Sequence, residues 1–168
     1  MPSPSKAKGN SFERQTADFL TDLYGEKFIR APGSGAYVGG KNTYRKQLLH
    51  EGQIRNFKGD IVPGQSFPRL NAECKSYKDF PFHQLFSQEI KLLEGWIDQC
   101  LDVADDGDFS IIMMKFNRKG TYVVVRPNER LTFKNNFDYT SSKHGLWIIM
   151  DHDEFWKLNS TQVKELCA

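Results

Sequence analysis

Asp60, Glu73 and Lys75 are the residues of this chain whose types and spacing fit the hydrolysis of a phosphodiester. Twelve residues separate Asp60 from Glu73, and Glu73 and Lys75 form a Glu-X-Lys pair. Residues 70–75 alternate with a period of two, so Glu73 and Lys75 share one face of a predicted strand. Residues 59–62 predict a neighbouring strand, which ends at a turn signal and brings Asp60 beside Glu73. Two carboxylates and an ammonium are therefore expected to meet.

Such a group suits metal-assisted hydrolysis, which needs an activated water and compensation of the charge on the phosphate. Asp60 and Glu73 are the expected ligands of Mg²⁺, with the backbone carbonyl of Cys74 as a further oxygen donor, and Mn²⁺ is expected to substitute. Lys75 would orient or help to deprotonate the attacking water. The alternative is an ordinary ion pair between Glu73 and Lys75 on an exposed strand, because Glu-X-Lys alone does not separate the two interpretations.

The first elements must carry these residues. Asn10 followed by Glu13 has the form of a capping pair and predicts a helix that starts near residue 10 and ends at Tyr24-Gly25. Glu13 is therefore open to two interpretations, as a helix-cap acid or as an acid of the site. Residues 27–30 predict a short strand that leads into a glycine-rich loop over 32–35.

Positive charge is concentrated over residues 27–58, where seven Lys and Arg residues face one acid, Glu51, for a net charge of +6. Residues 36–58 show weak periodicity, which predicts a mobile basic arm that follows a phosphate backbone. An aromatic ring between its cations could stack on a base. A solvated loop with scattered charges is the alternative. The candidate DNA contacts of the arm are Lys41, Tyr44, Arg45, Lys46, Arg55 and Lys58.

The second half of the chain predicts elements that complete a sheet. Apolar residues at helical spacing predict a long helix over 82–103, and residues 109–116 and 121–126 resemble the two strands of a hairpin. Residues 146–150 predict a further strand, and 151–166 predict one or two terminal helices. We therefore expect an α/β domain with a central mixed β-sheet flanked by α-helices, and an active site at the sheet edge.

The composition bounds the class of protein. A chain of 168 residues with 39% hydrophobic residues is expected to form one domain over 1–168, with a flexible tail over 1–8. It contains no long apolar stretch for a membrane span and no hydrophobic centre of a signal peptide, so a cytoplasmic location is expected. The three cysteines are too widely spaced for a disulfide framework or a zinc site and are expected to be reduced thiols.

Several short motifs resemble, in their order, those of the archaeal-type Holliday-junction resolvases, which belong to the PD-(D/E)XK nuclease superfamily. The motifs are Lys8-Gly9, Glu13-Arg14, Arg30-Ala31-Pro32-Gly33-Ser34-Gly35, Gly59-Asp60-Ile61 and Glu73-Cys74-Lys75-Ser76. They cover about the first half of the chain. The resemblance implies a restriction-endonuclease-like fold and a homodimer, in which each subunit carries a Mg²⁺ site and makes one of two symmetric nicks in a four-way DNA junction. A compact member with a divergent second half would suit a phage, and hence the host cytoplasm.

The resemblance also assigns roles to residues of this chain. The implied metal-site acids, catalytic lysine and loop serine near the scissile phosphate are, in that order, Glu13, Asp60 and Glu73, then Lys75, then Ser34. The implied or candidate basic DNA contacts outside the arm are Lys8, Arg14 and Arg30.

Two departures leave the substrate open. The family usually has Pro before the Asp, where this chain has Gly59, and the stretch from Ser34 to Asp60 is longer than the family pattern. A restriction-like or repair endonuclease that cuts duplex, flap or damaged DNA would keep the same site. A module that binds branched DNA without cutting it is the alternative of another class, although the intact set of Asp60, Glu73 and Lys75 argues against it.

Overall fold

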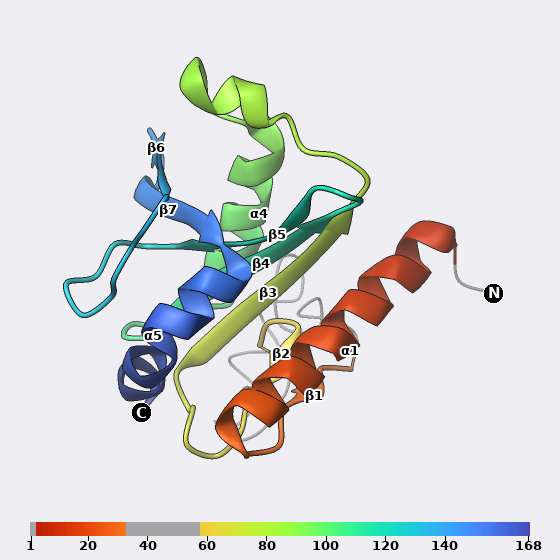
Figure 1. Cartoon of the computed structure of the whole chain (residues 1–168), viewed down its shortest axis with the longest axis vertical. Coiled ribbons are helices and arrows are strands. Elements are labelled where there is room, and N and C mark those ends of the chain that lie inside the picture. The colour runs from red at the N-terminus through yellow and green to blue at the C-terminus, as the bar shows by residue number, and fades with distance from the viewer. Residues whose placement is uncertain (1–2, 33–57) are drawn as a thin grey trace.

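A computed structural model describes residues 3–32 and 58–168 of the chain (Figure 1). The helical elements are α1 (Pro4–Tyr24), the 3₁₀ helix η2 (Phe82–Phe86), α4 (Lys91–Asp102) and α5 (His152–Cys167). The strands are β1 (Ile29–Arg30), β2 (Ile61–Val62), β3 (Leu70–Tyr77), β4 (Phe109–Phe116), β5 (Gly120–Val125), β6 (Phe137–Ser141) and β7 (Gly145–Asp151).

The described strands form a mixed sheet and a separate ribbon. The sheet has the order β3-β4-β5-β7-β6, and β1 and β2 pair only with each other. β3 and β4 are parallel, and every other neighbouring pair is antiparallel. This arrangement confirms the expected α/β fold with a central mixed sheet. β3 lies at one end of the strand order, so one of its edges is open to the ribbon.

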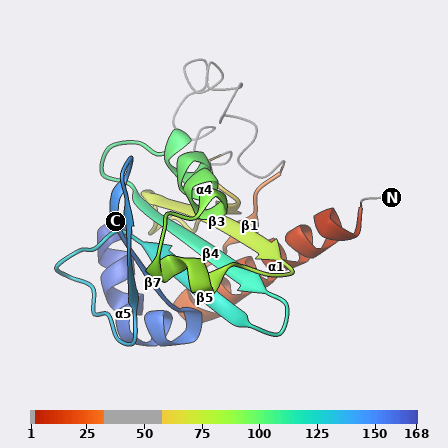
Figure 2. The same ribbon diagram turned by 90° about the horizontal axis from the view of Figure 1, so that it is seen from above.

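Helices cover both faces of the sheet. η2 and α4 form the crossover that two adjacent parallel strands need, and α4 packs on one face through Trp96 and Ile97. α1 and α5 pack on the other face, where Leu20 and Phe155 join the same core as Ala72. In Figure 2, α4 and α5 lie on opposite sides of the sheet. The side chains of β3 therefore face α1 and α5 on one side and α4 on the other.

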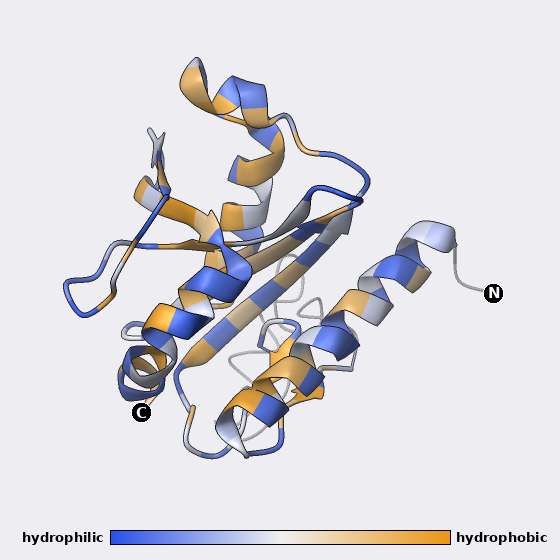
Figure 3. Ribbon diagram, in the orientation of Figure 1, coloured by the Kyte–Doolittle hydropathy of each residue, from blue (hydrophilic) through white to orange (hydrophobic). Residues whose placement is uncertain are grey.

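The alternation expected for β3 is confirmed. Leu70 and Ala72 belong to the core beneath α1 and α5, whereas Asn71 points to the other face and its Nδ2 donates to the carbonyl of Cys100 in α4 at 2.8 Å. Hydrophilic and hydrophobic residues alternate along β3 in Figure 3. A strand with polar side chains on a helix-covered face needs a partner for each of them, and Glu73 and Lys75 share that face.

Helix α1 begins earlier than expected. Ser3 caps it by accepting a hydrogen bond from the Lys6 N–H at 3.3 Å, and proline follows the cap, where its missing N–H is harmless. Residues 4–8 are therefore helical, and the expected flexible tail is wrong over this range. Asn10 and Glu13 lie inside the helix, so the expected capping pair is also wrong. The helix ends as predicted, at Gly25, whose φ of 65° and N–H bond to Thr21 close the last turn.

The expected helix over 82–103 is wrong as a single element. The chain instead forms η2, an irregular connection and α4, because the N–H of buried Ile90 is bonded by the hydroxyl of Tyr139 at 3.1 Å. Tyr139 belongs to β6, a strand that the sequence interpretation missed. The hairpin of β4 and β5, the strand β7 and the helix α5 are confirmed. Asp151 caps α5 by accepting from the Glu154 N–H at 3.0 Å.

Two expectations about the whole chain meet the structure directly. In the described ranges, no helix combines the length and the apolar character that crossing a bilayer would need. Cys74, Cys100 and Cys167 are free and buried, as expected for reduced thiols.

Candidate active site

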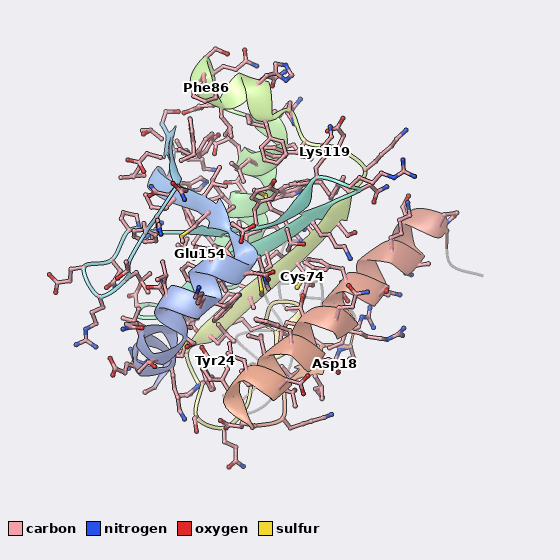
Figure 4. All side chains as sticks on the ribbon, in the orientation of Figure 1. Asp18, Tyr24, Cys74, Phe86, Lys119 and Glu154 are labelled. Atoms are coloured by element: carbon pink, nitrogen blue, oxygen red, sulfur yellow. The ribbon has the colours of Figure 1, made fainter. Side chains whose placement is uncertain are left out.

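The open edge of β3 receives Asp60. Its N–H donates to the Ala72 carbonyl at 2.8 Å, and its Oδ2 accepts from the Cys74 N–H at 2.7 Å. In a strand, the N–H and C=O of one residue point to the same side, so the Cys74 carbonyl also points to this edge. Figure 4 shows Cys74 on β3, beside α1. The expected meeting of Asp60 with the Glu-X-Lys strand is therefore present, and a backbone oxygen accompanies it.

Gly59 permits this close approach. Its φ is 66°, and a Cβ at this position would lie 2.7 Å from the Ala72 carbonyl oxygen and 3.1 Å from Oδ1 of Asn71. Proline fixes φ near about −65° and could not adopt this conformation. The departure from the resolvase pattern thus has a local cause, because the backbone before Asp60 passes against β3 in a left-handed turn that only glycine enters at little cost.

Asp60 and Glu73 form a close pair of buried carboxyl groups. Each residue is 2% exposed, and the two carboxyl groups approach within hydrogen-bonding distance. Burial, and then the charge of Glu73, raise the pKa of Asp60 well above its ordinary value. Burial also raises the pKa of Glu73, although the Lys75 ammonium acts in the opposite direction. Two buried carboxylates at this separation need a proton or a cation between them, which fits a site for a hard divalent metal.

Lys75 is held by two oxygen atoms. Its Nζ lies 2.9 Å from Glu73 Oε1 and 2.6 Å from Oε1 of Gln99 in α4. The pair with Glu73 was expected, but Gln99 was missed because it lies on the crossover helix, 24 residues away along the chain. The signal available in the sequence was that the face of β3 with Glu73 and Lys75 must be covered by the helix that follows it. Gln99 fixes the direction of the ammonium beside the acidic pair.

Glu13 lies on α1 and forms an ion pair with Nε of Arg30 in β1. Arg30 Nη2 also donates to Asn10 Oδ1 at 2.7 Å. The charge of Glu13 raises the pKa of both Asp60 and Glu73, so the three acids share one electrostatic neighbourhood. Within residues 3–32 and 58–168, however, no three His, Cys, Asp or Glu side chains are close enough together to hold a metal ion. The structure therefore brings Asp60 and Glu73 together and places Glu13 next to them in a pair with Arg30.

The candidate DNA contacts divide into two groups. Lys8 and Arg14 are exposed on α1, as a surface contact requires. Lys58 is 7% exposed, and its Nζ lies 3.1 Å from Asp105 Oδ2 and 2.6 Å from Asp108 Oδ2. The expectation that Lys58 contacts DNA is a misreading of its charge, because the ammonium is buried against two carboxylates that follow α4. The remaining candidates of the basic arm and loop lie outside the described residues: Ser34, Lys41, Tyr44, Arg45, Lys46 and Arg55.

Comparison with known families decides the class of protein. Residues 4–165 match the family described as "Phage putative PDDEXK endonuclease". The chain belongs to this family. The match spans both halves of the chain, so it extends past the motifs that resemble the junction resolvases. Asp60, Glu73 and Lys75 provide the acid, the second acid and the lysine for which PD-(D/E)XK nucleases are named, and nucleases of this kind typically use a divalent metal.

One curated relative of this family member is Protein D14 of Escherichia phage T5, which is 35% identical over 104 residues. The matched region covers 60% of this chain and 56% of the T5 protein, so this chain spans about half the length of that relative. No solved structure matches the chain.

Proposed function

We propose that this protein is a structure-selective endodeoxyribonuclease that resolves four-way DNA junctions by Mg²⁺-dependent hydrolysis. The observation that carries the nuclease activity is the buried Asp60–Glu73 pair on the open edge of β3, with the Lys75 ammonium 2.9 Å from Glu73. The order of its motifs, from Lys8-Gly9 to Glu73-Cys74-Lys75-Ser76, supports the choice of a junction as substrate.

Asp60, Glu73 and the Cys74 carbonyl would hold Mg²⁺, because they are hard oxygen donors that meet at one edge. When bound, the ion supplies Lewis-acid stabilisation of the charge that develops on the phosphate. Mn²⁺ prefers the same oxygen donors and is expected to substitute. Glu13 lies close enough to act on both carboxyl groups and is the further acid of the proposed metal site.

Lys75 performs the positioning step. Glu73 and Gln99 hold its ammonium in one direction, so that it orients the attacking water and balances negative charge on the phosphate. Removal of the Glu73 carboxylate would both weaken the metal site and release this lysine. Ser34 is the proposed residue near the scissile phosphate, by its place in the motif.

The proposed substrate requires two active sites, since the two strands are nicked symmetrically. A homodimer would supply one site from each subunit. Basic residues between β1 and β2, together with Lys8 and Arg14 on α1, would hold the branched DNA through its phosphates.

A cleavage assay tests this function. An end-labelled four-way junction and its linear duplex arms are incubated in equal amounts with Mg²⁺, beside the Glu73→Gln protein and an EDTA control. Paired symmetric nicks that are confined to the junction and lost in Glu73→Gln are the expected result.

Two other results would contradict it. Equal cutting of the junction and the duplex would point to a restriction-like or repair endonuclease with the same site. Binding of the junction without any cutting, unchanged by the metal, would point to a module that binds branched DNA. Wild-type cleavage by Glu73→Gln would refute the assignment of the site itself.

A further inference from the structure

A groove of about 520 Å³ opens beside the acidic pair, between the N-terminal turns of α1 and the C-terminal end of β3. One wall contains Lys6, Lys8 and Gly9, and the other contains Lys75 and Lys78. In Figure 1 these two segments lie at the same end of the molecule, and α1 runs antiparallel to β3. None of the residues that line the groove is an aspartate or a glutamate.

The cations of the groove differ from other lysines of the protein. Among the described residues, Lys6, Lys8 and Lys78 form no salt bridge, and all three are exposed. The nearby carboxylate of Asp79 is bonded to Lys119 at 2.6 Å, so it does not compensate the groove. The described lysines that are paired with carboxylates are Lys58, Lys75, Lys119 and Lys143. The groove thus gathers positive charge that the folded chain leaves uncompensated, which suits a polyanion.

Both walls order their charges in the same direction. On α1, Glu13 is followed toward the N-terminus by Lys8 and Lys6, which lie about 8 and about 11 Å further along the helix axis at 1.5 Å per residue. On β3, Glu73 is followed by Lys75 and then by Lys78, about 16 Å away at roughly 3.3 Å per residue. Each wall therefore leads from the acidic pair to the lysines.

We propose that this groove binds the phosphate backbone of the DNA strand that leaves the scissile position. One strand of a duplex carries a phosphate about every 3.4 Å along the axis, so the distances on α1 correspond to the second and third phosphates beyond the cut. Lys6 and Lys78 are then DNA contacts on opposite walls, together with Lys8. The inference rests on the proposed nuclease function, because it takes the acidic pair as the scissile position.

Gly9 offers a direct test that does not depend on removal of a lysine. A Cβ at Gly9 would have no heavy atom within 4 Å, so a longer side chain enters open space. Replacement of a helical glycine by a better helix former is also favourable, so the variants are expected to fold. Gly9→Glu places a carboxylate among the lysines, and Gly9→Gln places a side chain of the same size without charge.

The measurement is the affinity of each protein for a fluorescent linear duplex and a fluorescent four-way junction, titrated in EDTA over a range of salt. Gly9→Glu is expected to bind about eight-fold more weakly than Gly9→Gln near about 0.1 M salt, since each lost phosphate contact lowers the slope of log K against log salt by about 0.9. Lys6→Ala and Lys78→Ala are expected to lower the slope by a similar amount each. Lys157→Ala, at an exposed position on α5, is the control and should leave the slope unchanged.

The results separate the groove from the catalytic proposal. If the protein cleaves DNA with Mg²⁺ but Gly9→Glu binds as Gly9→Gln does, the groove proposal is overturned and the nuclease assignment stands. If the variants change the affinity as expected but the wild-type protein cleaves no DNA, the groove stands and the nuclease assignment fails. Absence of any DNA binding by the wild-type protein at low salt would overturn the groove proposal as well.

Discussion

Gly59→Ala should disrupt the active site from outside it. The residue has a φ of 66°, and its new Cβ would lie 2.7 Å from the Ala72 carbonyl oxygen, with backbone on both sides of the contact. The left-handed conformation costs a residue with a Cβ about 1–2 kcal/mol. Overpacking against a fixed neighbour costs about 1–3 kcal/mol more. We therefore expect the free energy of unfolding to fall by roughly 2–5 kcal/mol.

Gly25→Ala is the matched control. Gly25 has almost the same φ, 65°, but an added Cβ would have no heavy atom within 4 Å. It should lose only the conformational part, about 1–2 kcal/mol. The difference between the two variants measures the contact with Ala72 alone.

Urea denaturation in EDTA measures the stabilities, and junction cleavage with Mg²⁺, corrected for the folded fraction, measures the activity. The clash forces Asp60 away from the Cys74 N–H, so Gly59→Ala should lose most of its cleavage, whereas Gly25→Ala should keep it. Equal destabilisation of the two variants, with cleavage retained in both, would refute the claim that Asp60 depends on a close backbone approach.

Three further predictions follow from the geometry. Because burial raises the pKa values of Asp60 and Glu73, their contribution to the stability of the metal-free protein is fully present below about pH 4 and is lost as the pH rises through the raised values; urea denaturation in EDTA should show a decline from about pH 5 to about pH 8 that Glu73→Gln flattens and Mg²⁺ offsets. Gln99→Ala removes one of the two oxygen atoms that hold the catalytic lysine, so kcat should fall by about ten-fold with KM nearly constant, and Gln99→Glu, which keeps an acceptor, should fall less; equal kcat in the alanine variant would contradict the positioning role. Lys58→Ala leaves a buried carboxylate unpaired and should destabilise the fold by roughly 3 kcal/mol, while the affinity of the folded protein for DNA stays unchanged in salt titrations.

The sequence predicted the parts of the site that local patterns determine. Alternation over β3 and a turn signal after β2 were sufficient to bring Asp60, Glu73 and the lysine to one place, because each depends on residues within a few positions. The start of α1 was missed although Ser3 and Pro4 are a strong N-terminal signal, since Asn10 offered a competing one further along.

What the sequence did not predict depends on contacts between distant residues. Ile90 leaves the helical pattern because its N–H is bonded by Tyr139, 49 residues away. Lys58 resembles the exposed cations before it until the turn after α4 brings Asp105 and Asp108 to it. Gln99 reaches the catalytic lysine only through the parallel crossover of β3 and β4, and no local spacing encodes that contact.

The pairing of β1 with β2 has a consequence for how this enzyme family can diversify. Arg30 lies opposite Ile61, and the Ala31 N–H donates to the Asp60 carbonyl at 2.8 Å, so the chain is clamped on both sides of the sequence between them. The closure entropy of a flexible loop grows only slowly with its length, by about 0.6 kcal/mol for each doubling. Insertions and deletions between Ala31 and Gly59 can therefore accumulate without moving Asp60 from β3. Such a division lets a phage lineage exchange the residues that select a substrate while the chemistry beside them is inherited intact.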